Sequence, residues 1–366
     1  MPNSIGLYIH IPFCKNKCPY CDFYSVKITE KMLDEYVAKL LDIIKYWSAK
    51  CDKSLKTIYL GGGTPSVLGA ERLCGILDAV KKDFNIKKDA EITIEVNPDS
   101  GKTIDFDLLR ENGFNRISVG MQSAVDKELK ELGRIHTAEE AKLTVERAKK
   151  AGINNISLDL MMGIPFQTKE SLKESIEFCK ECSVTHISSY ILKIEENTLF
   201  AKIKDALSLA DEDEQADLYL YAVELLENLG YKQYEISNFA IDGFESRHNT
   251  NYWKCEEYIG IGPSAHSFFE GKRFYYGRSF EDFYDNKIIY DCDGGDEDEY
   301  IMLSLRLKSG LNFDEFKNRF QKNIPSDLII KAEKYIKLGF MTKTQNGIAF
   351  TPKGYLVSNS IISDLI

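Results

Sequence analysis

The sequence has no apolar run of the roughly 18 residues that a helix needs to cross a bilayer. Its apolar start is interrupted at once by His10, Pro12 and Cys14, so we expect no signal peptide. Basic residues are in the minority, with 47 Lys and Arg against 57 Asp and Glu, for a formal net charge of -10. Phosphate backbones and anionic lipids are poor partners for such a surface. We expect a cytoplasmic protein that reaches a membrane only through a partner and binds no nucleic acid.

Disulfide bonds are also not expected. A chain of 366 residues can bury an ample core without them, and the nine cysteines of a cytosolic chain should be reduced. Cys179 and Cys182 lie on a helical stretch, where cysteine packs as a small apolar side chain. Cys14, Cys18 and Cys21 are instead clustered near the start, which indicates a metal or redox site.

Six short apolar runs alternate with helical patterns over residues 1–235. The runs are IGLYIH, TIYLGG, EITIEV, RISVGM, NISLDLMMG and HISSYIL. Strands that alternate with helices are typical of βα units around a parallel sheet. The predicted fold class is therefore α/β, with a partial (β/α)6 TIM-like barrel. Residues 236–290 are predicted to form an extension with two loops, RHNTNYW and GPSAHSF.

Each of the six runs ends in polar or glycine-rich residues. In chain order the ends carry His10 with the three cysteines, Gly61 to Pro65, Glu95 with Asn97, Gln122 with Ser123, Asp159, and Tyr190. A single carboxylate at a strand end commonly caps a helix or faces solvent. In a parallel barrel, however, the C-terminal strand ends meet at one rim, where chemistry is found. The convergence of six such ends predicts an active site there.

The cysteine cluster has the spacing Cys14-x3-Cys18-x2-Cys21. Three thiolates can hold three irons of a cubane cluster and leave the fourth iron open to an outside ligand. The alternative is a structural zinc site completed by His10. Structural zinc sites usually pair two CxxC-like knuckles, and no second knuckle lies nearby in the sequence. We expect a [4Fe-4S] cluster on the three cysteines.

The CxxxCxxC motif after the first strand, followed by GGGTPS after the second, resembles the signature of radical S-adenosylmethionine (SAM) proteins. In that family SAM chelates the open iron, and an electron from the cluster cleaves its sulfonium to a 5'-deoxyadenosyl radical. The strings IEVNP, RISVGMQS, LGRIH, DLMMGIPFQT and YEISNFA resemble the family's HemN/HemW group. The resemblance implies a SAM site made of Tyr8, Tyr20, Gly62, Gly63, Thr64, Glu95, Gln122, Arg134 and Asp159.

The group has a branch of oxygen-independent coproporphyrinogen III oxidases and a branch of haem chaperones. The oxidase branch has a further cysteine two positions after the third ligand, where this sequence has Phe23. The stretch RHNTNYW resembles the HNxxYW element of the chaperone branch. It implies that haem is held by His248, Asn249, Tyr252 and Trp253. A lone loop histidine often has a structural role, so this assignment depends on the resemblance.

The expected function is thus a haem chaperone of porphyrin metabolism, which binds the cluster, SAM and haem and passes haem to an acceptor protein, including a membrane-bound respiratory one. The alternative is a radical SAM oxidoreductase that acts on a tetrapyrrole. His266 is a second candidate haem ligand. His10, His136 and His186 are expected to have structural roles.

The βα pattern stops near residue 291. The segment 291–299 carries six carboxylates and a Gly pair, which indicates a solvated linker or a helix start. Helical runs follow, and FMTKTQNGIAF then predicts two short strands around an NG turn. Residues 291–366 are therefore predicted to form a mainly helical, winged-helix-like domain. Residues 311–366 hold eight basic and five acidic residues, an excess of three (8 - 5), so partner docking is favoured over DNA binding.

Overall fold

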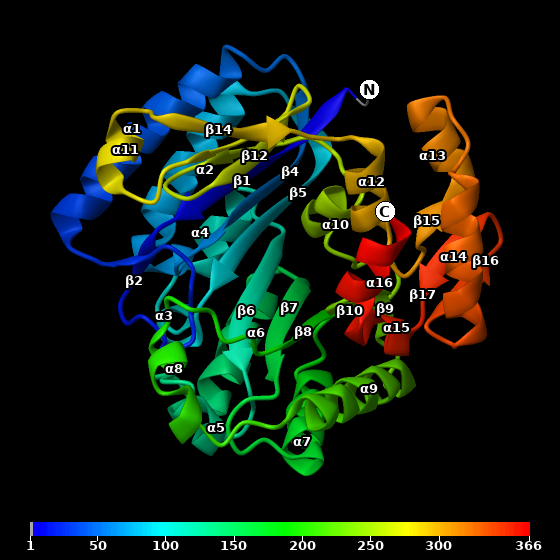
Figure 1. The fold of residues 1–366 in the computed structure, drawn as a ribbon. Helices are drawn as coiled ribbons and strands as arrows, with labels where there is room; N and C mark the ends of the chain where they lie inside the picture. The colour runs from blue at the N-terminus through cyan, green and yellow to red at the C-terminus, as the bar shows by residue number, and fades with distance from the viewer. Residues whose placement is uncertain (1–2) are drawn as a thin grey trace.

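The computed structural model describes residues 3–366, which form one large mixed sheet with helices packed on it and a smaller C-terminal module (Figure 1). The strand order of the large sheet is β14-β13-β12-β11-β1-β4-β5-β6-β7-β8-β10-β9. Its central strands run parallel and in chain order: β1 (Ser4–Ile11), β4 (Ser54–Gly62), β5 (Ile86–Val96), β6 (Arg116–Gln122), β7 (Asn155–Met162) and β8 (His186–Ile191). The predicted α/β class and partial barrel are confirmed.

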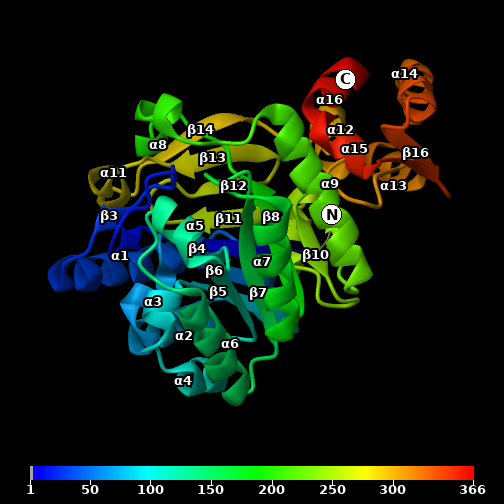
Figure 2. The same ribbon diagram turned by 90° about the horizontal axis from the view of Figure 1, so that it is seen from below.

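Helices cover the outer face of these strands (Figures 1 and 2). The longest is α1 (Glu30–Ser48). Thr29 caps its start, where the hydroxyl accepts a hydrogen bond from the Met32 amide, and the helix buries Leu33, Leu40 and Ile44 along one stripe. The others of this layer are α2 (Ala70–Asp83), α3 (Pro98–Gly101), α4 (Phe106–Glu111), α5 (Asp126–Glu131), α6 (Ala138–Lys150), α7 (Lys169–Glu181) and α9 (Glu212–Asn228), with a 3-10 turn at Pro65–Leu68. Helix α8 (Leu199–Lys202), which a 3-10 turn at Lys204–Ala206 follows, lies instead beside the cysteine loop, where the Phe200 amide donates to the Pro19 carbonyl over 3.0 Å. A short pair, β2 (Phe13–Cys14) with β3 (Val26–Lys27), begins and follows the cysteine loop.

The segment 236–290 adds strands to both edges of the same sheet. At one edge β11 (Tyr258–Ile261) pairs parallel with β1, and β12 (His266–Phe269), β13 (Lys272–Tyr276) and β14 (Ile288–Asp293) follow antiparallel. At the other edge β10 (Asn238–Ala240) pairs with β8 and with β9 (Lys232–Glu235). Two short helices, α10 (Arg247–Trp253) and α11 (Phe280–Tyr284), complete the segment. The proposed boundaries at 235 and 290 remain predictions.

The C-terminal module has helices followed by a hairpin, as the sequence predicts for a winged-helix-like fold. Its elements are α12 (Glu297–Ser304), β15 (Leu311–Asn312), α13 (Phe313–Phe320), α14 (Ser326–Lys337), β16 (Met341–Thr344), β17 (Gly347–Phe350), α15 (Pro352–Leu356) and α16 (Ser358–Leu365). The strands pair in the order β15-β17-β16. The module joins the barrel beside β9, where the Ile236 amide donates to the Arg306 carbonyl over 3.0 Å.

The alternation of side chains along each strand separates the core from the barrel lumen. On β1, Ile5, Leu7 and Ile9 are fully buried in the hydrophobic core. The intervening Tyr8 and His10 contact each other through a 3.0 Å hydrogen bond, and Tyr8 faces Tyr59 of β4. The lumen therefore carries polar and aromatic side chains. Among residues 3–366, no helix is both long enough and apolar enough to span a bilayer.

Candidate functional site

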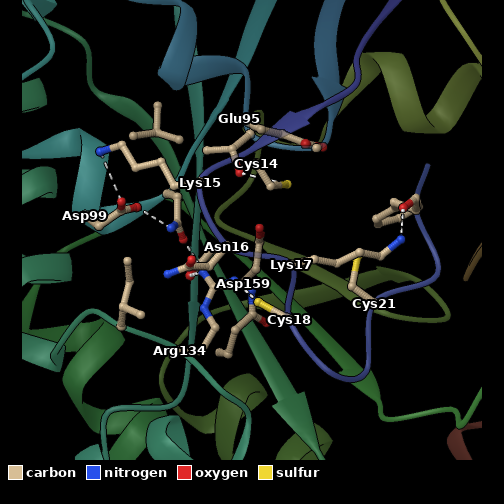
Figure 3. A pocket seen from close by; sticks show the side chains of 18 of the residues that line it. Cys14, Lys15, Asn16, Lys17, Cys18, Cys21, Glu95, Asp99, Arg134 and Asp159 are labelled. Atoms are coloured by element: carbon tan, nitrogen blue, oxygen red, sulfur yellow. Dashed lines mark hydrogen bonds and ion pairs between the residues drawn. The ribbon is translucent and has the colours of Figure 1, made fainter. Parts of the chain in front are cut away.

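A pocket opens at the C-terminal ends of the parallel strands (Figure 3). It is lined by the loop after β1 and by the ends of β4 to β8. Every cluster and SAM candidate of the sequence lines it except Tyr8: Cys14, Cys18, Tyr20, Cys21, Gly62, Gly63, Thr64, Glu95, Gln122, Arg134 and Asp159. Tyr8 lies one layer deeper in the lumen, bonded to His10. The structure thus brings together cluster and SAM candidates that are up to 145 positions apart (159 - 14).

The three cysteines of the loop are free thiols, each partly exposed. Hydrogen-bond donors already point at two of the sulfurs, because Arg134 Nη1 lies 3.4 Å from Cys18 Sγ and Thr64 Oγ1 lies 3.5 Å from Cys14 Sγ. Burial raises the pKa of the Cys21 thiol to about 11. Three accessible thiols on one loop, next to a cation and a hydroxyl donor, are a donor set that fits an iron–sulfur cluster.

Arg134 is held against the cysteine loop by three protein groups. Besides Cys18, its Nη2 donates to the Gly120 carbonyl over 2.6 Å and to the Asn97 side chain. Lys15 contributes a second cation to the same wall, where it pairs with Asp99 over 3.3 Å (Figure 3). The guanidinium is therefore fixed before any ligand arrives, and its Nε–H, which has no partner among residues 3–366, is left for a carboxylate.

The glycines after β4 allow this strand to approach the cysteine loop. The amide of Gly63 donates to the Ile11 carbonyl over 2.9 Å, and that of Thr64 to the Phe13 carbonyl over 2.8 Å. A Cβ on Gly63 would lie 2.6 Å from the Phe13 oxygen. Gly62 has a φ of +110°, a conformation that L side chains rarely adopt. The backbone itself therefore requires glycine here, in addition to the room for SAM that the sequence pattern implies.

Two partly buried carboxyls face the pocket. Glu95 accepts hydrogen bonds from the Tyr59 hydroxyl (2.8 Å) and the Gly62 amide (3.0 Å), while Asp159 accepts from Ser118 (3.0 Å). Burial raises the pKa of Glu95 to about 7 and that of Asp159 to about 6. Each carboxyl is thus anchored from below, with lone pairs left for the hydroxyls of a ligand.

Replacing Glu95 with glutamine should change how stability depends on pH. Because the folded-state pKa lies above the ordinary 4.5, ionising Glu95 costs stability, and this cost grows as pH rises from about 4.5 to about 7. A shift of that size corresponds to about 3 kcal/mol, which partial exposure to pocket water reduces to about 2 kcal/mol. In urea unfolding without ligands, the free energy of unfolding of Glu95→Gln relative to that of the wild type should rise by about 2 kcal/mol from pH 4 to pH 8. A difference that does not vary with pH would contradict this prediction.

The stretch RHNTNYW forms a helix, α10, and not the loop that the sequence suggested. Ser246 caps the helix by accepting a hydrogen bond from the Asn249 amide. The amides of Arg247 and His248 both donate to the buried Glu91 side chain, at 3.0 and 2.9 Å. These bonds anchor the start of α10 in the lumen. A stretch of seven residues is too short for its sequence pattern to predict a helix.

His248 lies inside the barrel and is 1% exposed. Its Nδ1 is hydrogen-bonded to the Thr57 hydroxyl (2.9 Å), its Nε2 to the Tyr252 hydroxyl (2.8 Å), and its ring stacks on Tyr59. Burial lowers the pKa of His248 to about 3, so the ring is neutral and has a single lone pair, which one of these hydroxyls occupies. Iron ligation by His248 stays a prediction, and it requires one of the two hydrogen bonds to break.

His248→Ala should therefore destabilise the protein. The substitution leaves a cavity and removes the partners of two hydroxyls, which costs about 3 kcal/mol. His248→Gln keeps one polar partner and should lose about half as much. Urea unfolding of both variants measures the effect. If His248→Ala unfolds at the wild-type urea concentration, the ring has no structural role.

The other predicted haem residues are divided between two environments. Asn249 lines a second cavity, while Tyr252 packs edge-on against Tyr258 with ring centroids 4.5 Å apart. Trp253 ends the helix and lines neither cavity. His266 begins β12, not a loop, and is exposed, stacked on Tyr275. Of the predicted haem residues, Asn249 alone lines either of these two cavities.

The remaining histidines have hydrogen bonds that fit structural roles. His10 bonds to Tyr8 and, over 2.9 Å, to the Tyr24 carbonyl, so both of its ring nitrogens are engaged and neither is free to ligate zinc. His136 bonds to the Met121 carbonyl, and His186 to Ser157 and Tyr234. Within residues 3–366, no three His, Cys, Asp or Glu side chains are close enough to hold one metal ion together.

Sequence reasoning missed the residues that support the rim from below. Tyr59 bonds to Glu95, Ser118 to Asp159, and Arg116 lies beneath them in the lumen. Ser118 and Arg116 precede Gly120 on β6 by two and four positions, so they share its face. Extending the period-two pattern backward from the strand ends would have found them.

Comparisons with known proteins agree with this architecture. Residues 8–179 match the model of the radical SAM superfamily, and residues 298–357 match the HemN C-terminal domain. Among solved structures, coproporphyrinogen III oxidase (HemN) from Escherichia coli, described as a radical SAM enzyme, has a TM-score of 0.83 at 22% identity, over 99% of this chain and 90% of that chain. This structural likeness concerns the fold alone.

Three similar curated proteins are named Heme chaperone HemW. The one from Lactococcus lactis is 35% identical over 100% of this chain and 97% of its own, and that from Bacillus subtilis is 33% identical over 97% of each. The one from Escherichia coli is 41% identical over 72% of this chain and 69% of its own. The chain therefore belongs to the radical SAM superfamily and, within its HemN/HemW group, to the HemW family.

Proposed function

We propose that this protein is a haem chaperone, which binds a [4Fe-4S] cluster, SAM and haem and passes haem to an acceptor protein. The observation that carries the proposal is the 35% identity, along nearly the full length of both chains, to a protein named Heme chaperone HemW. The rim pocket supports it, because the three thiols and every SAM candidate except Tyr8 line this one pocket. We infer that acceptors include membrane-bound respiratory proteins.

Cys14, Cys18 and Cys21 would hold the cluster. When bound, a three-cysteine cluster supplies one iron that is open to an outside ligand, and an electron. The protein's own part is to stabilise the thiolates. Arg134 and Thr64 donate to two of the sulfurs, and such hydrogen bonds adjust the potential of a cluster.

The same rim would hold SAM through groups of complementary chemistry. Glu95 and Asp159 offer lone pairs to ribose hydroxyls, and Arg134 offers a guanidinium N–H to a carboxylate. The Gly62 and Gly63 backbone leaves room for the amino group. Gln122, held by a 2.9 Å hydrogen bond from the Tyr190 hydroxyl, closes the far side of the pocket.

Haem would occupy the second cavity, which joins the rim pocket and has a volume of about 540 Å³. This volume lies in the range of about 300 to 1,000 Å³ that is usual for cofactor sites. Both spaces share Tyr20, Cys21 and Phe23. Phe23 is 66% exposed at their common mouth. Its flat apolar ring is well suited to a porphyrin face, and it stands where the oxidase branch has a cysteine.

An anaerobic assay distinguishes the proposed haem chaperone from the alternative function, oxidation of a tetrapyrrole. The reconstituted protein is incubated with SAM, a reductant and coproporphyrinogen III, and the porphyrins are then separated by chromatography. A chaperone should leave coproporphyrinogen III unchanged. Formation of protoporphyrinogen would overturn the proposal, whereas iron and sulfide analysis cannot decide because both functions need the cluster.

A further inference from the structure

Arg116 lies deep in the barrel lumen, and two of its nitrogens have no hydrogen-bond partner among residues 3–366. It is the first residue of β6, it is 2% exposed, and it is among the largest fully enclosed side chains of the protein. Within residues 3–366, neither its Nε nor its Nη1 has a hydrogen-bond partner. Arginine stays protonated in proteins, so this is a buried cation that lacks acceptors for two of its three nitrogens.

A buried charge without a partner is strongly unfavourable, and native proteins normally pair or hydrogen-bond such groups. Arg134, the arginine of the rim pocket, largely follows this rule: its Nη1 and Nη2 reach three protein groups, and among residues 3–366 its Nε alone lacks a partner. Arg116 departs from it, although it lines the cavity of about 540 Å³. No protein group within residues 3–366 accepts a hydrogen bond from its Nε or Nη1, which leaves these donors for a ligand.

The protein's own carboxyls near this cavity are already engaged. Glu95 bonds to Tyr59 and Gly62, and Asp159 bonds to Ser118 and Ser157. The charge of Arg116 acts to lower the pKa of both carboxyls, but burial outweighs it, and each pKa is raised. Neither carboxyl is a hydrogen-bond partner of Arg116 Nε or Nη1, and both already accept hydrogen bonds from other groups.

We propose that Arg116 binds a propionate carboxylate of haem seated in this cavity. This inference rests on the proposed function and adds an orientation to it. Haem has two propionates as its anionic groups, and arginine is the preferred partner of carboxylates because its planar fork of donors matches their shape. With a propionate at Arg116, beside Asn249 on the cavity floor, the opposite edge of the porphyrin points to the mouth at Phe23.

SAM is the other ligand with a carboxylate, and the geometry argues against it. Arg116 does not line the rim pocket with the three cysteines, and it faces only the deeper cavity. In the proposed function the carboxylate of SAM lies at the cluster. The rim already provides Arg134 for that group, which leaves Arg116 to a second anion.

The test compares wild type, Arg116→Met and Arg116→Lys with Arg110→Met, which removes an exposed arginine of α4. Haem and haem dimethyl ester, whose propionates are neutral, are titrated into each reconstituted protein. The affinity for SAM and the melting temperature without ligands are measured for the same proteins. Arg116→Met should bind haem about tenfold to a hundredfold more weakly, the range for one hydrogen bond to a charged group, and Arg116→Lys should lose less. Arg110→Met should bind haem like the wild type.

Three further results are expected. Haem dimethyl ester should bind equally to wild type and Arg116→Met, and SAM affinity should change much less than haem affinity. Without ligands, Arg116→Met should melt no lower than the wild type because an unpaired buried charge is gone. Unchanged haem affinity, an equal loss for the ester, or a loss confined to SAM would each overturn the inference and leave the proposed function standing. A wild-type protein that binds no haem would overturn both.

Discussion

Replacing Cys18 with alanine is expected to abolish the cluster, so that the reconstituted protein holds almost no iron in place of about four atoms per chain. Cys18 lies at the centre of the loop, and its sulfur receives the hydrogen bond from Arg134. Without it, two thiols remain for a cubane that needs three. Iron and sulfide analysis, together with loss of the brown absorbance, measures the effect.

Cys292→Ala is the matched control for Cys18→Ala. Cys292 is an exposed free thiol on β14, outside the pocket. This variant should bind the wild-type amount of iron and keep the same spectrum. If Cys18→Ala retains a full cluster, or if both variants lose it equally, then Cys14, Cys18 and Cys21 are not its ligands.

Gly63→Ala should abolish SAM binding and destabilise the fold by about 3 kcal/mol, at the upper end of the usual cost of forcing extra atoms into a packed site. The added methyl would lie 2.6, 2.8 and 2.9 Å from backbone atoms of Phe13 and Ile11. Backbone atoms cannot rotate away as a flexible side chain can. The end of β4 and the cysteine loop would have to separate, which would displace Cys14 and the Gly62 amide together.

Gly75→Ala makes the same chemical change in the middle of α2, where nothing lies within 4 Å of the new methyl. It should stabilise the protein by about 1 kcal/mol, the usual preference of a helix for alanine, and leave SAM affinity unchanged. Urea unfolding and equilibrium SAM binding compare the two variants. SAM binding by Gly63→Ala at wild-type affinity would contradict the close packing of the rim.

The rim could be predicted because its information is local. In a parallel barrel each strand places its last residues at the same edge, so Glu95, Gln122 and Asp159 needed only a correct strand prediction to be brought together. The cysteine spacing then limited the chemistry. The α/β class followed from the same alternation of strands and helices.

The haem element could not be placed in this way because its conformation depends on distant partners. A seven-residue helix is unstable by itself, and α10 forms here because Glu91, from β5, accepts hydrogen bonds from its first amides. Thr57 and Tyr59 of β4 then enclose His248. None of these contacts leaves a pattern in the sequence near RHNTNYW. The sequence therefore predicted a loop histidine where the structure has a buried one.

The edge strands were missed for a similar reason. The strands β11 to β14 are four to six residues long, and β11 pairs with β1, which is about 250 positions earlier in the chain. Short strands of this kind carry little periodic signal, and tertiary pairing decides their conformation. The cavity floor combines β6, β8, β10 and α10, and it therefore depends on the same long-range pairings.

Anaerobic titration of haem into the protein reconstituted with cluster and SAM is the most direct test of the proposed function. A haem chaperone should develop a Soret band that saturates at about one haem per chain and should release that haem to an acceptor chemically unchanged. Absorbance that rises linearly with added haem and never saturates would show that the protein has no haem site, and this result would contradict the proposed function.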